Sequence, residues 1–191
     1  MRTTSALPFR RRIYPKRSSW PSASSAASTA RFRTKGCHPL LDEIDTAARD
    51  LHSVNTVRFA DGKATGFNTD ILGFAESLNR DGVSLRVKRV LLLGYGGAAS
   101  VMAYHCVTQG AYLTITGRNL EKAEALQKQL TDAVPGARIS VFEPPASQFR
   151  RDIHIVLNST PVGMYPKETR LRCIICRTRP SMCSMRSTIR R

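Results

Sequence analysis

The sequence lacks long apolar runs, an even set of cysteines and, over its first 35 residues, any Asp or Glu. None of its apolar stretches approaches the eighteen or more residues that a membrane-spanning helix needs, so no membrane partner is expected. Five cysteines at irregular spacing do not form a disulfide framework, which favours a reducing, cytoplasmic setting. Cys173 and Cys176 form a C-x-x-C pair, but no second pair stands at zinc-ligand spacing, so no metal site is expected.

The net charge of +16 is concentrated in the two ends of the chain. Residues 1–35 contain nine Lys and Arg and no acidic residue, and residues 167–191 contain eight against one acidic residue. Residues 36–166 contain thirteen basic and thirteen acidic residues, so this part is neutral. A nucleic-acid-binding domain normally carries its basic patch on the folded part. We therefore expect no specific nucleic-acid partner. The alternative is a non-catalytic basic protein that binds nucleic acid through its ends.

Residues 1–35 are rich in Arg, Ser and Ala, with three consecutive arginines at Arg10–Arg12. A segment of this composition buries little apolar surface, so we expect it to be disordered. An Arg- and Ser-rich start without acidic residues also resembles an organellar transit peptide. Out-of-frame translation is a third interpretation, and all three stay open at this point.

From residue 39 onward the chain shows the regular patterns of folded structure. Residues 39–50 space their apolar side chains as a helix does. Residues 54–67 predict a hairpin that turns at Asp61-Gly62. An amphipathic helix over 71–79 follows, with Asn68, Thr69 and Asp70 as capping residues. Strands and helices then alternate, which predicts parallel strands joined by crossovers. The predicted strands are 89–93, 112–116, 138–142 and 153–157, and the predicted helices are 97–109 and 120–134.

A glycine-rich turn follows the first of these strands. The stretch Val90–Ser100 reads VLLLGYGGAAS, so the apolar strand ends at Gly94, with Gly96 and Ala99 close behind. This is the spacing of the dinucleotide-binding fingerprint. One glycine makes the turn, the next lets the backbone approach a pyrophosphate, and the third small residue allows close packing. An ordinary strand–helix turn is the alternative, and the surrounding βαβ pattern favours the nucleotide site.

The end of the second strand carries an arginine where an NAD-binding fold carries an acid. That acid, about twenty residues after the first glycine, holds the ribose 2′-hydroxyl of NAD. Here the position reads Thr116-Gly117-Arg118-Asn119 and offers no carboxylate. A guanidinium suits a phosphate, so Arg118 favours NADP, with Asn119 as a further donor. The alternative is that Arg118 is a solvated loop residue.

Five short motifs follow one another along the chain: VNTV at Val54–Val57, GFNTDILGF at Gly66–Phe74, LLGYGGAAS at Leu92–Ser100, TGRN at Thr116–Asn119 and NSTPVGM at Asn158–Met164. In both order and spacing they resemble the motifs of the shikimate dehydrogenase family, which includes the quinate/shikimate dehydrogenases. The resemblance covers about residues 39–166. It implies a substrate domain followed by a Rossmann domain, and reduction of 3-dehydroshikimate to shikimate with NADPH in aromatic amino acid biosynthesis.

The resemblance also implies roles for individual residues. Asn55 would hydrogen-bond the substrate's hydroxyls, and Asp70 would bind a hydroxyl and act with a lysine in proton transfer. Asp70 has the alternative role of a helix N-cap, and the two roles can coexist. Arg118 would take the 2′-phosphate of the cofactor. The pyrophosphate would contact Gly94, Gly96, Gly97 and Ala98, and the nicotinamide would lie beside Thr160, Val162 and Met164.

The chain departs from the family pattern at both ends. A serine-containing substrate motif and an N-V-T-x-P-x-K segment with the catalytic lysine are not visible before Val54, and Lys35 lacks the surrounding motif. After Pro166 the family continues into a strand resembling V-F-D-x-V-Y-N-P, which this chain lacks. Suitable codons for Met182–Arg191, read from the last base of Met182, encode VFDAVYNPP. We therefore expect an out-of-frame tail, little dehydrogenase turnover, and protease-sensitive ends around the core.

The predicted fold is α/β, with a Rossmann-type parallel sheet that has helices on both faces, preceded by a remnant of a smaller α/β substrate domain. We expect an open sheet edge beside the strand that ends at Leu157. The expected function is an NADP-dependent, shikimate dehydrogenase-like oxidoreductase with a small-molecule substrate. A quinate/shikimate dehydrogenase of quinate catabolism is the alternative. The expected segments are a basic disordered segment over 1–35, a partial substrate domain over 36–82, an incomplete NADP-binding domain over 83–166 and an aberrant basic tail over 167–191.

Overall fold

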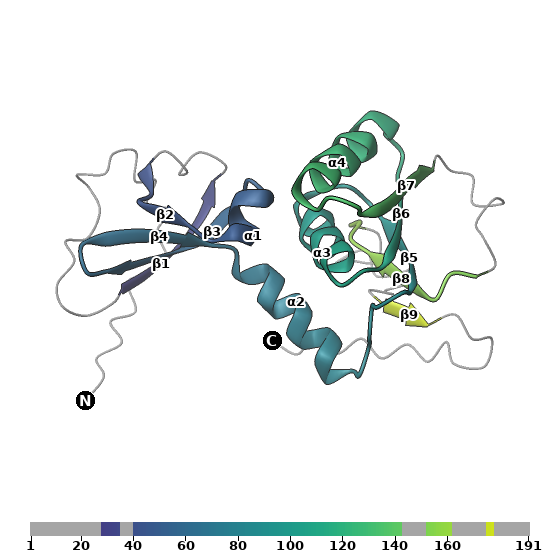
Figure 1. The fold of residues 1–191 in the computed structure, drawn as a ribbon, viewed down its shortest axis with the longest axis horizontal. Helices are drawn as coiled ribbons and strands as arrows, with labels where there is room; N and C mark the ends of the chain where they lie inside the picture. Colours follow the sequence, from purple (N-terminus) through teal and green to yellow (C-terminus); the bar gives the residue numbers. More distant parts are fainter. Residues whose placement is uncertain (1–27, 35–39, 143–151, 162–174, 178–191) are drawn as a thin grey trace.

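The computed structural model describes residues 28–34, 40–142, 152–161 and 175–177. They form two units, each built on one β-sheet, and helix α2 (Thr69–Arg80) leads from the first to the second (Figure 1). None of the helices in these ranges combines the length and hydrophobicity of a membrane span. The first sheet has the strand order β1 (Ser28–Thr34), β3 (Val54–Ala60), β4 (Lys63–Phe67) and β2 (Glu43–Ile44).

The predicted hairpin is confirmed as the centre of the first sheet. Strands β3 and β4 pair antiparallel, with Ala60 opposite Lys63. The two residues between them, Asp61 and Gly62, have φ of 51° and 73°. Both therefore adopt the left-handed conformation that a tight two-residue hairpin turn requires, and Asp and Gly tolerate it best. Buried apolar side chains from the two strands form a small core with Ala48.

The predicted helix over 39–50 is wrong for its first half. Only Thr46–Asp50 form a helix, α1, which the Asp45 side chain caps by accepting a hydrogen bond from Ala47 N. Before it, β2 pairs parallel with β4, and Asp42 Oδ2 accepts a hydrogen bond from Ala64 N at 2.8 Å. The backbone of this segment is therefore bonded to the edge of the sheet, which overrides the helical spacing of its apolar residues.

Two further expectations are corrected at the sheet edges. Residues 28–34, expected within the disordered segment, form β1 and pair antiparallel with β3. The edge beside Leu157, expected to be open, is covered by β9 (Ile175–Arg177), which pairs antiparallel with β8 (Ile155–Asn158). An edge strand offers unpaired backbone donors and acceptors to any neighbouring segment, whatever its side chains. The first expectation rested on composition and the second on the absence of the family's next strand, and neither takes account of backbone pairing by another segment.

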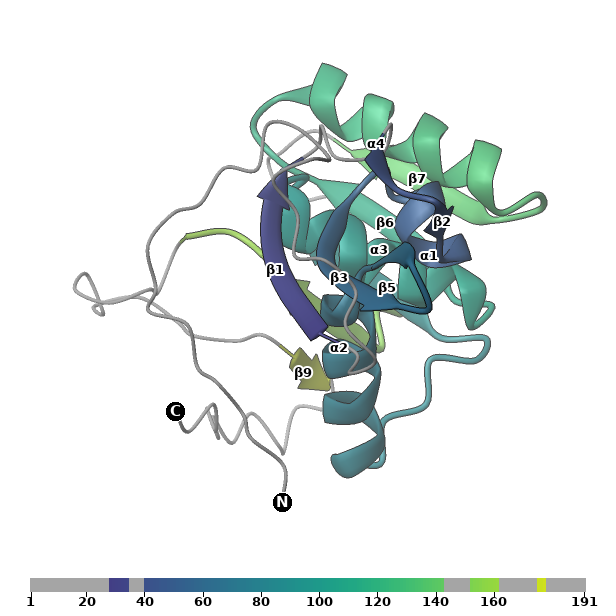
Figure 2. The same ribbon diagram turned by 90° about the vertical axis from the view of Figure 1, so that its left-hand side faces the viewer.

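The second unit is a Rossmann-like α/β layer, as predicted. Its sheet has the order β7 (Arg138–Phe142), β6 (Tyr112–Thr116), β5 (Arg89–Leu93), β8 and β9, and the first four strands run parallel. Helix α3 (Gly97–Thr108) connects β5 to β6, and α4 (Leu120–Ala133) connects β6 to β7. The two helices pack against each other and against this sheet (Figures 1 and 2). A helix on the opposite face would fall between β7 and β8, where residues 143–151 lie outside the described ranges.

The core of the second unit explains why its strands and helix α3 are so apolar. Strand β5 contributes Val90 and Leu92, both fully buried, and β8 contributes Leu157. Helix α3 has buried residues on nearly all sides, because the sheet, α4 and α2 all pack against it. Its apolar sequence is therefore typical of a central helix rather than a surface one. Strand β8 is displaced by one to two residues from the predicted 153–157.

Asp50, at the end of α1, joins the first unit to the helices of the second. The Tyr104 hydroxyl on α3 donates to Asp50 Oδ2 at 2.7 Å. Gln129 Nε2 on α4 donates to the Asp50 carbonyl oxygen at 3.0 Å. Burial and the adjacent carboxylate raise the pKa of Tyr104 to about 12, so this hydroxyl keeps its proton and its role as a donor at neutral pH. The two units are therefore fixed to each other by α1 as well as by α2.

Candidate nucleotide and substrate site

Gly94 lies where the end of β5 meets the ends of two other strands. Its N–H donates to the Thr116 carbonyl at the end of β6, at 2.9 Å. Its φ is +107°, a conformation that residues with a side chain rarely adopt. A Cβ at this position would lie 2.5 Å from Ser159 Oγ, which itself donates to the Leu93 carbonyl at 2.7 Å. The first glycine of the fingerprint is thus required both by its backbone conformation and by its contact with the end of β8.

Helix α3 begins with two glycines whose side-chain positions face open space within the described part of the chain. Gly96 is its N-cap residue and has no side chain with which to make a capping hydrogen bond. A Cβ built on Gly96 or Gly97 would meet nothing within 4 Å. Gly96, Gly97 and Ala98 are all exposed, whereas Ala99 is fully buried against the core. A twelve-residue helix with an uncovered N-terminus can hold an anion through its N–H groups and its dipole.

The loop after β6 places Arg118 and Asn119 beside this turn. Asn119 is the N-cap of α4, and its Oδ1 accepts from Lys122 N at 2.9 Å. The amide NH₂ is therefore the part of Asn119 that remains to donate to a ligand. Arg118 is exposed, and within the described residues it makes no ion pair. Its guanidinium is accessible to an anionic ligand.

The end of β8 brings Thr160 to the same place. Asn158 Oδ1 accepts from Thr160 N at 3.0 Å and from Thr160 Oγ1 at 2.6 Å. Thr160 Cγ2 lies 3.4 Å from where a Cβ of Gly94 would be, so the two segments touch. Val162 and Met164, expected beside a nicotinamide, lie outside the described residues.

Asn55 and Asp70 lie together in the first unit, at the start of α2. The Asn55 side-chain oxygen accepts from Thr69 N at 2.9 Å and from the Thr69 and Thr56 hydroxyls at 3.2 and 3.0 Å. Because a backbone N–H can only donate, the amide oxygen must face it, and the NH₂ is left to donate elsewhere. Asn55 can therefore serve as a donor to a ligand oxygen.

Asp70 is not the N-cap of α2. That role belongs to Asn68, whose Oδ1 accepts from Asp70 N at 3.2 Å. Asp70 stands in the first turn, exposed, where its negative charge is compatible with the helix dipole. The N-cap role considered for Asp70 is therefore wrong, because Asn68 takes it.

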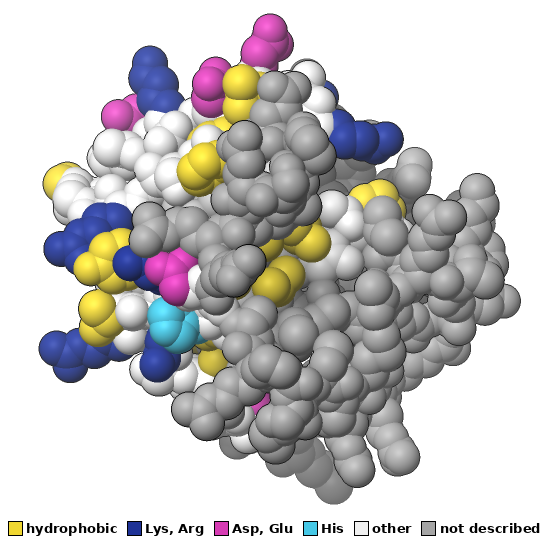
Figure 3. All heavy atoms as spheres, turned by 90° about the vertical axis from the view of Figure 1, so that its right-hand side faces the viewer, with side chains coloured by type: hydrophobic (Ala, Val, Ile, Leu, Met, Phe, Trp, Pro, Cys, Tyr) yellow, Lys and Arg dark blue, Asp and Glu magenta, His cyan; other side chains and the backbone are white. Residues whose placement is uncertain are grey.

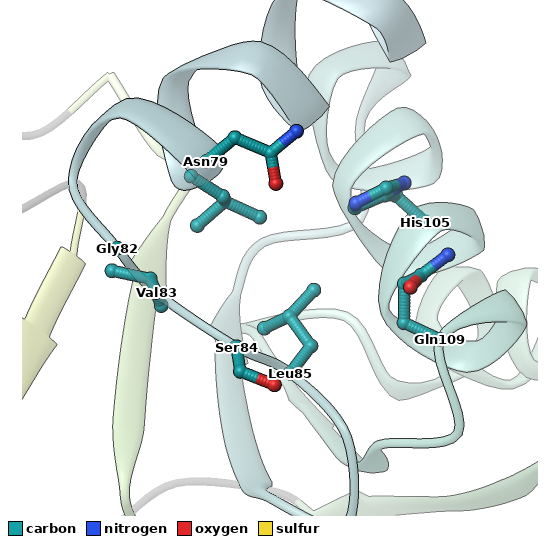
Figure 4. A pocket seen from close by; sticks show the side chains of 8 residues that line it. Asn79, Gly82, Val83, Ser84, Leu85, His105 and Gln109 are labelled. Atoms are coloured by element: carbon teal, nitrogen blue, oxygen red, sulfur yellow. The ribbon is translucent and has the colours of Figure 1, made fainter.

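A cavity of about 270 Å³ lies away from these residues, at the opposite end of α3 (Figure 4). It is bounded by the end of α2, the segment 82–85 and the side chains of His105 and Gln109. Burial lowers the pKa of His105, which also packs edge-on against Phe74. This cavity contains none of the residues predicted for a nucleotide or substrate site.

The described residues add no metal or thiol chemistry to the site. They contain no group of three or more His, Cys, Asp or Glu placed to hold a metal ion. Cys106 is buried in α3, and burial raises the pKa of its thiol to about 12, so it does not form a reactive thiolate at neutral pH. Cys173 of the C-x-x-C pair lies outside the described ranges. Where Figure 3 shows described side chains, basic and acidic ones are interspersed.

Sequence reasoning missed two residues of this region. Ser159 packs on Gly94, and the ring of Tyr95 packs on Gly117. Both are contacts between strand ends far apart in the chain. The only local sequence signal for either contact is Tyr95 itself, a large aromatic residue between Gly94 and Gly96.

Comparison with known proteins shows that the chain is similar to shikimate dehydrogenases. Residues 76–159 match the family model described as shikimate / quinate 5-dehydrogenase. The shikimate dehydrogenase (NADP(+)) of Carboxydothermus hydrogenoformans is 37% identical over 137 residues, which cover 71% of this chain and 48% of that protein. The chain therefore spans about half the length of the curated relatives it matches.

Solved structures agree in fold. Shikimate 5-dehydrogenase from Listeria monocytogenes, in complex with shikimate and NAD, superposes with a TM-score of 0.65 at 27% identity. The match covers 72% of this chain and 50% of that one. The Thermus thermophilus enzyme, in complex with NADP(H) and shikimate, gives a TM-score of 0.54 at 30% identity, covering 68% of this chain and 45% of that one.

Proposed function

We propose that this chain, whose matched part belongs to the shikimate/quinate 5-dehydrogenase family, binds NADP(H) and a shikimate-class substrate for hydride transfer. The observation that carries the proposal is the pairing of an uncovered helix N-terminus with Arg118 at the end of the next strand. The relatives are named as NADP(+)-dependent, and related structures hold NAD or NADP(H). The choice between the two cofactors is therefore argued from Arg118.

The phosphates of the cofactor would lie over the start of α3. Gly96 and Gly97 leave the space, and their N–H groups with that of Ala98 supply donors for the pyrophosphate. Arg118 would bind the 2′-phosphate with paired charged donors, and the Asn119 NH₂ would donate a further bond. Thr160, which touches the glycine turn, would lie on the nicotinamide side.

The substrate would bind at the joint of β3 and α2. The Asn55 NH₂, which remains as a donor because the amide oxygen accepts from Thr69 N, would donate to a substrate oxygen. NADPH, when bound, supplies the hydride that reduces a ketone such as that of 3-dehydroshikimate. Reduction leaves an alkoxide that needs a proton, and Asp70 would be the acid that takes part in supplying it. The lysine that acts with this acid in the family has no visible counterpart in this sequence. The family description also includes quinate, which stays the alternative substrate.

Replacing Arg118 with alanine is expected to weaken NADPH binding about tenfold to a hundredfold and to leave NADH binding unchanged. A hydrogen bond to a charged group contributes about 1.5–3 kcal/mol, and each 1.4 kcal/mol is about tenfold in affinity. The measurement is a fluorescence titration of both nucleotides against the whole chain. Arg86→Ala removes an exposed arginine near the other end of the sheet and serves as the matched control. If NADPH and NADH bind equally and Arg118→Ala changes neither, the cofactor proposal fails.

Replacing Asn55 with aspartate is expected to weaken shikimate binding to the chain saturated with NADP⁺ by about tenfold, because a donor is lost and a negative charge added. The new carboxylate still accepts from Thr69 N, so the start of α2 keeps its bond and the thermal midpoint changes little. Calorimetric titration with shikimate measures this. Asn79→Asp makes the same change near the far end of α2 and should not affect binding. Unchanged shikimate affinity in Asn55→Asp would exclude Asn55 from the substrate site.

A further inference from the structure

Tyr95 is the one residue of the glycine turn whose size the dinucleotide fingerprint does not explain. Its side chain is half-buried and packs against the core of the second unit. The edge of its ring lies directly on Gly117, in the loop after β6. A Cβ added to Gly117 would lie 2.6 Å from Tyr95 Cδ1 and would overlap the neighbouring Cε1. The ring therefore occupies the space that a side chain at position 117 would fill.

Gly117 is needed for this contact and not for its backbone conformation. It is absent from the described residues with positive φ, so an alanine could adopt the same backbone. The glycine is explained by the ring alone. Tyr95 after β5 and Gly117 after β6 are thus complementary in size. They meet beside the hydrogen bond from Gly94 N to the Thr116 carbonyl.

Arg118 directly follows the glycine on which the ring rests. Its guanidinium is exposed and has no ion-pair partner among the described residues, so no ion pair anchors the side chain. The backbone on either side therefore sets the position of Arg118. On the far side, Asn119 is fixed by its capping bond to Lys122 N. On the near side, Gly117 is fixed by the ring of Tyr95. Loops held in their binding geometry lose less entropy when a ligand binds.

We propose that Tyr95 is a positioning residue that holds the Gly117-Arg118 backbone for the 2′-phosphate and so sets the preference for NADP(H) over NAD(H). This inference rests on the proposed function of Arg118. Tyr95 acts through the arginine and makes no bond of its own to the phosphate. Its hydroxyl has no hydrogen-bond partner among the described residues, so the ring is the part that matters.

The test is the ratio of NADPH to NADH affinity, which a general loss of stability does not change. Tyr95→Ala is expected to lower this ratio about tenfold through weaker NADPH binding, and Tyr95→Phe to keep it. Tyr95→Leu retains apolar contact with the core but lacks the ring edge, so it should lower the ratio even if Tyr95→Ala fails to fold. Tyr112→Ala removes an aromatic ring from the other end of β6, next to Arg89 and Arg138, and should leave the ratio unchanged.

A double-mutant cycle separates the contact from other effects. Gly117→Ala should lower the ratio in the wild-type chain, because its methyl group displaces the ring, and should cause no further loss beside Tyr95→Ala. Additive losses would overturn the inference. If Arg118→Ala weakens NADPH binding while the Tyr95 variants keep the wild-type ratio, the proposed function stands and the positioning role fails. If Arg118→Ala changes nothing, the proposed function fails first and the positioning role falls with it.

Discussion

Replacing Gly94 with alanine is expected to lower the free energy of unfolding by about 2–6 kcal/mol. The backbone at φ +107° strains any residue with a side chain, which costs about 1–3 kcal/mol. The added methyl group would also lie 2.5 Å from Ser159 Oγ, and overpacking of this kind costs typically about 1–3 kcal/mol. Ser159 cannot retreat freely, because its hydroxyl and its N–H both donate to the Leu93 carbonyl.

Urea denaturation followed by circular dichroism measures this loss, and Gly96→Ala is the matched control. Gly96 has a φ of −83°, and a Cβ there meets nothing within 4 Å among the described residues. The free energy of unfolding should therefore change by no more than about 0.5 kcal/mol. The same methyl group fills the space assigned to the pyrophosphate, so NADPH affinity should fall in a chain of normal stability. A Gly94→Ala chain as stable as the wild type would contradict the geometry of the turn.

Replacing Asn68 with alanine is expected to destabilise the chain by about 2–4 kcal/mol. Asn68 is 5% exposed and makes two bonds, accepting from Asp70 N and donating through Nδ2 to the Ser53 carbonyl at 3.1 Å. Loss of an N-cap costs about 1 kcal/mol, and a carbonyl left without its partner at a buried site about 1–3 kcal/mol more. The same change loosens the start of α2, so the bonds that hold Asn55 and the position of Asp70 change with it.

Asn119→Ala is the control for Asn68→Ala, because Asn119 also caps a helix but is described with only the single bond to Lys122 N. We expect it to lose only about 1 kcal/mol. Thermal and urea unfolding of both variants test the difference. Equal losses in the two would show that the tie to Ser53 contributes nothing.

The second unit could be predicted from the sequence because its signals are local and agree. Buried strands, a glycine turn and two amphipathic or apolar helices follow one another at short range, and each appears within a residue or two of its predicted bounds. The segment 39–50 failed because its apolar spacing suits a helix while its backbone bonds to β4. Strands β1 and β9 could not be foreseen, because pairing at a sheet edge depends on the distant partner strand.

The candidate site was predictable at its glycines and at Arg118, where residue type and spacing carry the signal. The structure brings the glycine turn into contact with the ends of β6 and β8, and the binding roles of these residues stay predictions. The contacts of Tyr95 with Gly117 and of Gly94 with Ser159 join segments far apart in sequence, and no local pattern encodes them. That the NH₂ of Asn55 is the group left to donate depends likewise on Thr69, fourteen residues away in the chain.

The order of the strands determines where in the sheet a ligand site can form. From β5 the chain first adds β6 and β7 on one side of the sheet and then places β8 on the other. The reversal falls between β5 and β8, where Gly94 meets Ser159 and Thr160. In open parallel sheets this switch point is where ligands bind, because the connecting segments diverge there. The location proposed for the nucleotide thus follows from chain topology. Under the proposed function, substitutions at Tyr95 or Arg118 would change which nucleotide is preferred, and the strand order would keep the position of the site unchanged.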